Sequence, residues 1–590
     1  MRFKMGRISI LNPEIIHQIA AGEVVERPAS VVKELLENSI DAGANQITIK
    51  IIEAGLKEIK VIDNGSGMTK DDAILALERH ATSKITSIED LNCLRTLGFR
   101  GEALPAIAAV SRFTLITRTP EEISGIKLIA IGGKIESISS IGCPPGTQVT
   151  VKDLFYNTPA RRKFLKSLKT EAATISDVIT RFALGYPEIS FRYYSGNQLR
   201  FATNGQGNLL DVLGIIYGND AIRNFIELSF QEKGIQLYGF ISLPKFCRAN
   251  RSHQSFFVNR RLVYNSLLNH SIENAYRGLI PKGLFPIVVL FITLDPSTVD
   301  VNVHPTKREI RFSNPTLIAD TIQQGVRNAL ITHLASQKFL LEPKISSISP
   351  ITSTENNDKD KPTLVLNTAG IHEEKTSYSY IRETLSFQEQ KAPFNFQSLH
   401  VIGQALGSYI VAEGEGEIYF IDQHAAHERI RYESIKKAVH NKKGIPFHQK
   451  LISPIELRLT PQQREIYEEY KNFIASLGYT LKESPNGTIS ILAVPVGLVD
   501  NPEAFLVEIL DFLQENVEIE RMQPETVREK ATILFACKSA IKAGDRLNIE
   551  EMQGILEQLD KTEQPETCPH GRPTYFKITD AELRKKFHRT

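Results

Sequence analysis

The sequence predicts a multidomain protein of mixed α/β class, in which layered α/β units are separated by a polar tether. The chain has 590 residues, more than one ordinary hydrophobic core supports, so about two to four domains are expected. Helical patterns alternate with β-rich runs such as 45–54 and 112–119, which favours layers of helix on sheet. A stretch at 337–397, rich in Ser, Thr, Asn and Lys, divides the chain into two folded regions.

These patterns predict the order of the domains. Residues 1–215 are expected to form one α/β domain, and 216–336 a second α/β unit. Residues 337–397 are expected to be a flexible linker of about 60 residues, which spans roughly 45 Å as a coil. Residues 398–590 are expected to form a C-terminal α+β domain with an inserted subdomain near 458–527.

One helix of the inserted subdomain has clear boundary signals. Thr460 is a good N-cap, Pro461 suits the first helical position, and Gln463 stands where a capping box needs it. Gly478 is a suitable residue for the C-terminal stop. The sequence therefore predicts a capped helix that begins at Pro461 and ends at Gly478.

Composition narrows the class of protein without identifying it. The chain carries 70 basic and 68 acidic residues, so any surface for nucleic acid must be local. The five cysteines are too sparse for a disulfide scaffold and favour a reducing cytoplasm. The most apolar stretch, 284–294, is too short to span a bilayer and contains Pro286, so no membrane partner is expected.

The first of three motif segments near the start, KELLENSIDAGA at 33–44, predicts a helix that faces a nucleotide. Glu34 and Asn38 stand four residues apart, so their side chains share one helical face and can address one metal-bound phosphate. A carboxylate beside an amide oxygen suits a general base next to a magnesium ligand.

The other two segments, 61–68 and 97–104, supply a base site and a phosphate site. Asp63 ends a strand, and Gly65 and Gly67 follow it; the carboxylate can accept an amino hydrogen while the glycines admit a planar ring such as adenine. In the third segment glycines at 98 and 101 flank Arg100 just before a helical run, an arrangement that attracts phosphate oxygens. No Walker-type GxxxxGK[ST] motif occurs.

The order and spacing of these segments resemble the GHKL ATPases, which include gyrase B, the ninety-kilodalton heat-shock chaperones, sensor histidine kinases and the MutL family. The stretches at 18–44, 79–84, 98–104 and 155–165 are similar to the MutL family of DNA mismatch repair proteins. The resemblance implies a GHKL ATPase sandwich, then a ribosomal-protein-like transducer domain, and a C-terminal dimerisation and endonuclease domain after the flexible linker. A topoisomerase subunit or a chaperone that shares only the ATPase domain is a more distant alternative.

The resemblance also implies roles for individual residues in binding ATP and Mg²⁺. Glu34 orients or deprotonates the attacking water, Asn38 coordinates magnesium, and Asp63 holds adenine. Lys307 reaches the terminal phosphate from the transducer domain. The phosphate and base pocket is lined by Thr82, Ser83, Arg100, Gly101 and Thr147. For Thr82 and Ser83 an ordinary helix-to-loop turn is the alternative.

A second chemical site is predicted in the C-terminal domain. Asp422 ends a strand, and His424 and Glu428 follow on one helical face at a spacing typical of metal ligands. Further donors stand far downstream, at Cys537, Cys568 and His570. Thiolate, imidazole and carboxylate together suit Zn²⁺ or Mn²⁺ better than Mg²⁺ alone. Taken singly, Cys537 is equally well explained as a small buried hydrophobe.

These C-terminal segments resemble the MutL subgroup that nicks DNA, whose signature is DQHA followed by two spaced glutamates, here Glu428 and Glu433. The resemblance implies metal-dependent phosphodiester hydrolysis with Asp422 and Glu428 as catalytic residues, and it places Asp422 among the metal ligands. Lys538 departs from the commonest pattern, because the family often has arginine there. The alternative function is an ATP-gated scaffold in which the cluster holds structural zinc and no nuclease activity exists.

Two basic segments are candidates for sequence-independent binding of double-stranded DNA. Arg162 and Lys166 recur, together with Lys169, along one face of a predicted helix and would form a phosphate track. Arg260 and Arg261, which stand among aromatic residues, are the second candidate. A solvated basic face is the alternative for both.

The remaining expectations concern protein partners. Gln449, Ile452 and Pro454 resemble the short motif by which nuclease-type MutL proteins dock on the sliding clamp, with an exposed loop as the alternative. The resemblance further implies a homodimer, recruitment by the mismatch sensor MutS, and a cytoplasmic location at the nucleoid.

Overall fold

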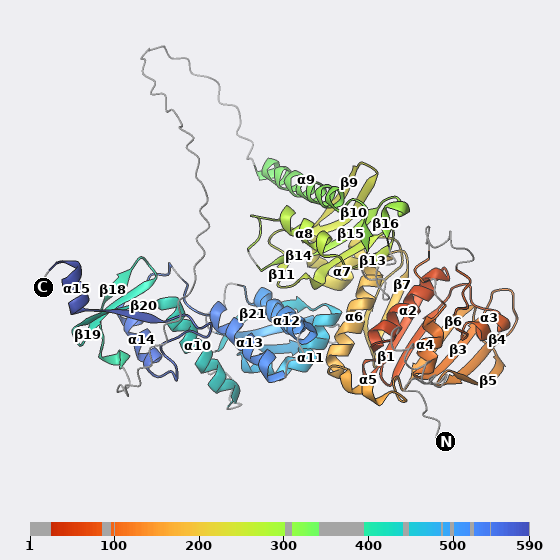
Figure 1. Ribbon diagram of the computed structural model, residues 1–590, viewed down its shortest axis with the longest axis horizontal. Helices are drawn as coiled ribbons and strands as arrows, with labels where there is room; N and C mark the ends of the chain where they lie inside the picture. Colours follow the sequence, from red (N-terminus) through yellow and green to blue (C-terminus); the bar gives the residue numbers. More distant parts are fainter. Residues whose placement is uncertain are drawn as a thin grey trace, which may run out of the picture.

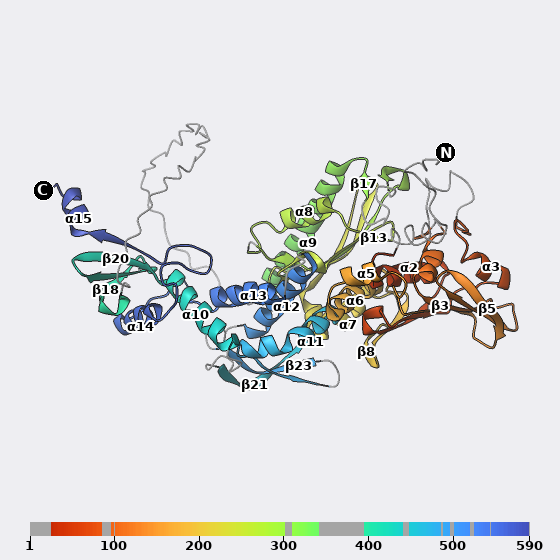
Figure 2. The same ribbon diagram turned by 60° about the horizontal axis from the view of Figure 1, so that its bottom comes forward.

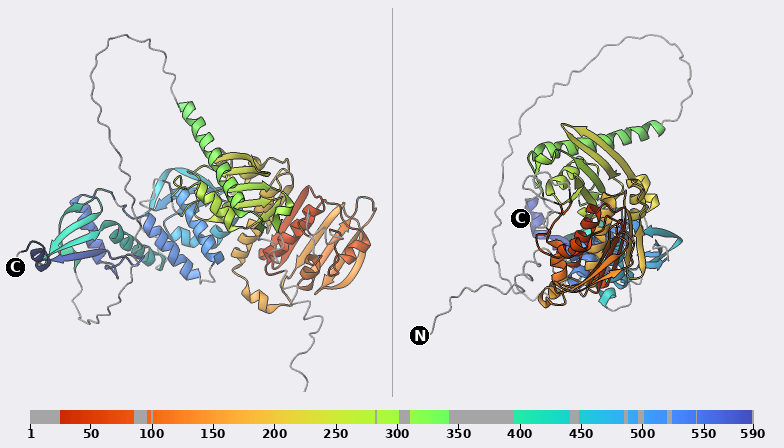
Figure 3. Two further views of the ribbon diagram at one scale, coloured as in Figure 1. Left: turned by 45° about the horizontal axis from the view of Figure 1, so that its top comes forward. Right: turned by 90° about the vertical axis from the view of Figure 1, so that its right-hand side faces the viewer.

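The structure is a computed structural model, and it describes residues 25–84, 96–98, 101–281, 283–300, 310–341, 395–440, 448–484, 488–495, 501–519, 524–542 and 544–588. Figure 1 shows an elongated molecule. The N-terminal lobe lies at one end and a small C-terminal sheet at the other. A second C-terminal unit lies between them, next to the lobe that follows the N-terminal one in sequence (Figure 3).

The N-terminal lobe is built on one mixed eight-stranded sheet with the order β5-β4-β3-β6-β2-β1-β7-β8. Its strands are β1 (Gln46–Ile52), β2 (Glu58–Asp63), β3 (Arg112–Arg118), β4 (Gly125–Ile131), β5 (Lys134–Ile141), β6 (Gly146–Lys152), β7 (Ser190–Ser195) and β8 (Gln198–Ala202). Its helices are α2 (Pro28–Asp41), α3 (Lys70–Leu75), α4 (Ala103–Ala109), α5 (Pro159–Phe164) and α6 (Leu168–Gly185). Alternate residues of β1, namely Ile47, Ile49 and Ile51, are buried in one core with the apolar faces of α2, α4 and α6.

Helix α2 illustrates how the sequence positions the site. Pro28 occupies its first turn, where no backbone donor is lost, and Gly43 follows its end with a φ of 72°. Val31, Val32, Leu35 and Leu36 pack into the core, so the helix turns its remaining side towards a cavity.

The second lobe has a five-stranded sheet with the order β13-β12-β15-β10-β9. Its elements are α7 (Leu209–Tyr217), β9 (Phe225–Glu232), β10 (Ile235–Ser242), β11 (Cys247–Arg248), β12 (Gln254–Val258), β13 (Arg261–Val263), α8 (Ser266–Ala275), β14 (Phe285–Pro286), β15 (Val288–Thr293), β16 (Val299–Asp300), β17 (Arg311–Phe312) and α9 (Pro315–Leu341). Phe257 and Val289 of this sheet belong to the same buried core as α6, so the two lobes are closely joined. Gly185 permits this contact, because a Cβ there would lie 2.2 Å from the Phe257 ring.

The C-terminal region consists of two units. The first has the sheet β18-β19-β20-β24 and the second the sheet β21-β23-β22. The elements are β18 (His400–Ala405), β19 (Tyr409–Gly414), β20 (Glu417–Asp422), α10 (Gln423–His440), β21 (His448–Arg458), α11 (Pro461–Ser476), β22 (Thr480–Glu483), β23 (Thr488–Pro495), α12 (Pro502–Ile519), α13 (Pro524–Lys538), α14 (Ile549–Asp560), β24 (Tyr575–Thr579) and α15 (Asp580–Lys586). Helix α10 joins the units, with Ala426 in the first core and Tyr432 in the second. The subdomain expected at 458–527 lies within the second unit.

The predicted fold class, mixed α/β with several domains, is confirmed. The predicted start of α11 is also confirmed: the Thr460 side chain accepts from Gln463 N, and Gln463 Oε1 accepts from Thr460 N. Within the described residues no helix is long and apolar enough to cross a membrane.

Candidate nucleotide site and metal centre

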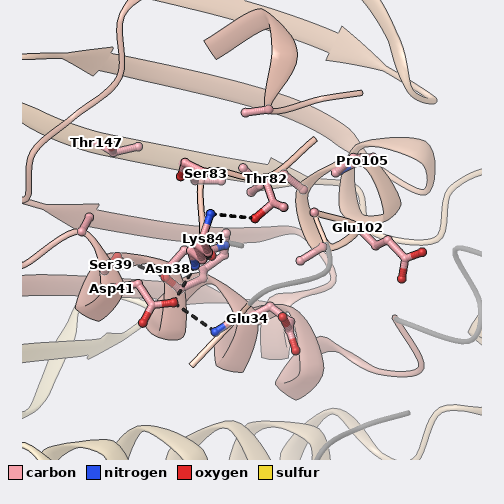
Figure 4. A pocket seen from close by; sticks show the side chains of 18 of the residues that line it. Glu34, Asn38, Ser39, Asp41, Thr82, Ser83, Lys84, Glu102, Pro105 and Thr147 are labelled. Carbon is pink, nitrogen blue, oxygen red and sulfur yellow. Dashed lines mark hydrogen bonds and ion pairs between the residues drawn. The ribbon is translucent and has the colours of Figure 1, made fainter. Parts of the chain in front are cut away.

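A cavity of about 1230 Å³ opens in the N-terminal lobe, bounded by α2, the end of β2, α4 and the residues around 79–84. Figure 4 shows side chains from these separate segments pointing into one space. Of the residues predicted from the sequence, nine line it: Glu34, Asn38, Asp63, Gly67, Thr82, Ser83, Gly98, Gly101 and Thr147. Arg100 and Lys307 lie outside the described residues, and Gly65 is not a lining residue, although its N–H donates to Asp63.

Asp63 is fixed by three hydrogen bonds. Its Oδ2 accepts from Ser39 Oγ at 2.8 Å, and its Oδ1 accepts from Gly65 N at 3.0 Å and from Thr147 N at 3.2 Å. Burial raises the pKa of the Asp63 carboxyl, although these bonds to the charged form oppose the rise. A rigid, partly desolvated acceptor at the end of a strand suits recognition of an exocyclic amino group.

Two of the predicted glycines are required by close backbone approach. A Cβ on Gly67 would lie 2.0 Å from Arg118 O, and one on Gly101 would lie 2.3 Å from Ala81 O. Both residues also have φ near the left-handed region, 69° and 62°. The walls of the cavity beside Asp63 and before α4 therefore depend on glycine.

The predicted magnesium ligand Asn38 is part of a charged cluster. Lys84 Nζ donates to Asn38 Oδ1 at 2.9 Å and to Asp41 Oδ2 at 2.5 Å. Asp41 also accepts from Leu97 N at 2.8 Å and from Gly98 N at 3.0 Å. The donor set fits a hard cation, because an amide oxygen and a carboxylate of one helix face the same point.

Sequence reasoning did not single out Asp41, Lys84 or Ser39. Asp41 follows Asn38 by three residues, so helical spacing could have placed it on the same face. Its role in holding Leu97 and Gly98 depends on tertiary contacts, which no local pattern reveals. Lys84 is the last residue of the 79–84 motif, and nothing in the sequence predicts its contact with Asn38 and Asp41.

The C-terminal cluster is organised by α10 and the residues after α13. His424 Nδ1 donates to Ile541 O at 2.7 Å, while His427 Nδ1 accepts from Ile541 N at 2.9 Å. Burial lowers the pKa of His427 to about 4, which keeps that ring neutral and able to accept. These two bonds fix the end of α13, and with it Cys537, against α10.

Glu428 lies at the centre of the predicted metal ligands. His424 Nε2 is 3.1 Å from Glu428 Oε1, and His570 Nδ1 is 3.4 Å from Glu428 Oε2. Potential ligand atoms fall into two groups that share Glu428: one with His424 and Cys537, the other with Cys568 and His570. Within each group all ligand atoms lie within 4.8 Å of one another. The set of imidazole, carboxylate and thiol donors fits a zinc-like or manganese-like ion.

The tautomer of His424 supports a ligand role. Because Nδ1 donates to a backbone carbonyl, a neutral ring turns the lone pair of Nε2 towards Glu428. Two such acceptors at close range need a shared proton or a shared cation. Burial, with the Glu428 carboxylate second, raises the pKa of the Cys537 thiol to about 12, so a cation is needed to favour its thiolate.

Asp422 and Glu433 have different surroundings. Asp422 Oδ1 accepts from His424 N at 2.9 Å and Ala425 N at 3.0 Å, so the carboxylate caps α10 and is not in the ligand groups. Glu433 is buried and accepts from Glu563 N at 2.7 Å and Gln564 N at 3.2 Å. Glu433 thus anchors the segment that leads to Cys568.

The predicted DNA residues fall in two places. Arg162 is exposed on α5, whereas Lys166 lies between α5 and α6 and Lys169 lies on α6, so the predicted single basic helical face is wrong. Arg260 forms an ion pair with Glu188 of the N-terminal lobe, and Arg261 donates to Thr96 O. Arg260 and Arg261 therefore contact the neighbouring lobe in this structure.

The predicted clamp motif lies on β21, not in a loop. The pairing of β21 with β23 shifts register between Lys450 and Ile455, and the residues between protrude from the ladder. Gln449 and Pro454 are exposed, and Ile452 is fully exposed. Ile452 is thus a protruding apolar side chain that is available to a partner.

Comparison with known proteins agrees with this architecture. Residues 26–138 match the family described as histidine kinase-, DNA gyrase B-, and HSP90-like ATPase, residues 213–331 match the DNA mismatch repair protein C-terminal domain, and residues 402–547 match the MutL C-terminal dimerisation domain. The chain is 38% identical to the DNA mismatch repair protein MutL of Symbiobacterium thermophilum, covering 99% of this chain and 100% of that one. It is 36% identical to MutL of Desulforamulus reducens, with the same coverage. A solved Aquifex aeolicus MutL ATPase domain complexed with ADP is 28% identical over 51% of this chain and 98% of that one, with a TM-score of 0.37.

The N-terminal fold and its cavity define an ATPase domain of the GHKL class. Full-length similarity then extends this assignment through the second lobe and the C-terminal region. The chain belongs to the MutL family of DNA mismatch repair proteins.

Proposed function

We propose that this protein is an ATP-driven dimeric switch that couples mismatch recognition to metal-dependent nicking of one DNA strand. The observation that carries the nicking activity is the convergence of His424, Cys537, Cys568 and His570 around Glu428. His424 and Glu428 precede Cys537 by more than 100 residues, and Cys568 and His570 lie on a third segment beyond it, so local sequence effects do not explain their meeting.

In the ATP half of the proposal, Glu34 acts on the attacking water and Asn38 offers its amide oxygen to magnesium. Asp63 accepts from the adenine amino group, which its three hydrogen bonds support by fixing the carboxylate. Gly65, Gly67, Thr82, Ser83, Arg100, Gly101 and Thr147 complete the pocket, and Lys307 reaches the terminal phosphate. Lys84 must release Asn38 when a cation binds, because both need the same oxygen.

In the DNA half, the ligand groups around Glu428 would hold Zn²⁺ or Mn²⁺. A bound ion supplies Lewis acidity and lowers the pKa of a water. Asp422 orients the start of α10, and thereby His424, through its capping bonds. Glu428 belongs to both ligand groups, and its carboxylate would help to hold the ion.

The proposed partners are a second copy of the chain, double-stranded DNA, the sliding clamp and MutS. Phe420 and Phe576 stack at 5.0 Å on the outer face of the β20–β24 pair, and Ile402 of β18 is half-exposed. This apolar face supports a homodimer. Double-stranded DNA is expected along Arg162 and Lys166, the sliding clamp at the β21 protrusion, and the mismatch sensor MutS elsewhere. The protein would then act in the cytoplasm, at the nucleoid.

The test compares nicking of supercoiled plasmid in Mn²⁺ by the wild type with two variants, Asp422→Asn and Glu428→Gln. We expect both to lose nicking while ATP hydrolysis persists. A matched control, Glu557→Gln, removes an exposed carboxylate of α14 and should nick normally. Equal nicking by the wild type and both variants would refute the nuclease.

A second candidate function is the ATP-gated scaffold with structural zinc. It is favoured by the two cysteines of the ligand groups and by the capping role of Asp422, both typical of sites that hold a fold together. Tightly bound zinc in a protein that does not nick DNA in any divalent ion would support the scaffold.

A further inference from the structure

A buried charged contact joins the second C-terminal unit to the N-terminal lobe. Arg200 of β8 lies 2.6 Å from Glu465 and 3.1 Å from Glu468, both on α11. The side chains of Arg200 and Glu465 are only 5% and 2% exposed. Figures 1 and 2 show α11 lying beside α6, at the boundary between the two halves of the chain.

The same face of α11 engages the start of α6. Lys169 Nζ donates to Glu468 at 2.6 Å, and Ser167 Oγ donates to Glu469 Oε1 at 2.9 Å. Burial alone would raise the pKa of Glu468, but the bonds from Lys169 and Arg200 hold it below its usual value. We call Glu465, Glu468 and Glu469 the acidic face of α11.

A third group of contacts reaches the second lobe. Asn250 Nδ2 donates to Asp511 O at 2.9 Å, and His253 Nε2 lies 3.4 Å from Asp511 Oδ1 on α12. Gln462 Nε2 donates to Asp177 Oδ1 at 2.8 Å. Asp177 also pairs with Arg181, whose guanidinium donates to Gln254 O, so three parts of the chain meet at α6.

The burial of these groups indicates that the surface of α11 and the surface formed by α6 and β8 are complementary. A charged side chain withdrawn from water is costly unless an opposite charge and hydrogen bonds offset the loss. Arg200 finds both of its carboxylate partners on α11, and Ala173 of α6 is buried in the apolar core of the second C-terminal unit. Apolar contact and complementary charge coincide, as in a specific interface.

We propose that the second C-terminal unit, residues 448–538, docks on α6, β8 and the 250–253 turn of its own chain, holding the nucleotide half and the metal half as one body. The occupant of this surface is thus the acidic face of α11, with Asp511 of α12 beside it. This docked state is independent of whether the metal cluster cuts DNA.

Small-angle X-ray scattering on the full-length protein tests the docking. Arg200→Glu places a carboxylate against the acidic face and should increase the radius of gyration. The double variant Arg200→Glu with Glu465→Arg exchanges the charges and should restore the wild-type curve. Arg192→Glu makes the same charge change on the exposed side of the adjacent strand β7 and should leave the curve unchanged.

A second variant guards against misfolding, because Arg200 is buried. Lys169→Glu changes a half-exposed side chain and should expand the molecule with unaltered circular dichroism. Wild-type scattering from both Arg200→Glu and Lys169→Glu would overturn the docking. Restored compactness on mixing the single variants Arg200→Glu and Glu465→Arg would overturn its assignment to one chain, since only contact between chains could then pair the exchanged charges.

Discussion

At the scale of single residues, the site rests on side chains whose partners are far away in sequence. The prediction that Glu34 and Asn38 share a face needed only helical geometry, and α2 places both at the cavity. The pairing of Asp41 with Lys84 joins positions 43 residues apart and depends on how the chain folds back. In the C-terminal region the helical spacing of His424 and Glu428 could be predicted from the sequence, whereas the hydrogen bond from His424 to Ile541 O could not.

The acceptor role of Asp63 gives a prediction at this scale. Asp63→Asn should weaken ATP binding at least about tenfold. The carboxylate accepts from Gly65 N and Thr147 N and still has a charged oxygen for the base, whereas an amide has one acceptor oxygen and no charge. Titration calorimetry measures the affinity, and Asp71→Asn, an exposed change on α3, is the control. Unchanged affinity would mean that Asp63 does not hold the base.

At the scale of elements, the contact between α2 and α6 stabilises α2, the helix that carries Glu34 and Asn38. Arg27, which precedes α2, donates to both oxygens of Glu171 on α6, at 3.2 and 2.9 Å, and the Glu171 side chain is 2% exposed. The Arg27–Glu171 ion pair thus joins α2 and α6 at their N-terminal ends. The local stability of α2 should depend on this ion pair.

Removal of the Glu171 carboxylate tests this dependence. Glu171→Ala should cost about 3 kcal/mol of local stability, because Arg27 loses its buried partner. Amide hydrogen exchange in 28–41 should then accelerate about 100-fold. Glu53→Ala breaks an exposed pair with Lys57 and should change exchange little. Unaltered protection of α2 in Glu171→Ala would show that packing alone holds the helix.

The metal cluster gives a second prediction for elements. Each ligand group bridges two segments, α10 to α13 in one and α10 to the turn at 568–570 in the other, so saturation should stabilise the C-terminal region by about 2.7 kcal/mol at 100-fold excess over Kd. Differential scanning fluorimetry should show a higher Tm with Zn²⁺ and a lower one after chelation. Cys568→Ser should reduce that response; an identical response in the variant would exclude Cys568 as a ligand.

At the scale of the whole molecule, Arg261 links the second lobe to the nucleotide cavity. It donates to Thr96 O, and Thr96 lines the cavity beside the backbone that Asp41 holds. Arg261→Ala should lower kcat for ATP hydrolysis several-fold while nucleotide affinity stays near wild type. Steady-state kinetics separate the two effects. Arg260→Ala, which removes an exposed ion pair, is the matched control, and equal kcat in both variants would argue against the link.

The layered architecture was predictable because periodicity and turn residues act locally. The two α/β regions, the capped start of α11 and the helix carrying His424 all follow from such signals. The contact of α11 with α6 was not predictable, since it joins side chains about 300 positions apart and the glutamates involved have ordinary helix-surface spacing. Arg260 and Arg261 likewise suggested a basic surface, whereas both contact the adjoining lobe.

Lys169 has a consequence for how affinities are measured. It belongs to the predicted phosphate track and also to the contact with the acidic face of α11, so a polyanion and that helix compete for one ammonium group. A truncated protein that stops before α11 leaves Lys169 and Arg200 without these carboxylates. The DNA affinity measured on such a fragment would therefore exceed the affinity of the intact protein for double-stranded DNA, and the difference would be largest at low salt concentration.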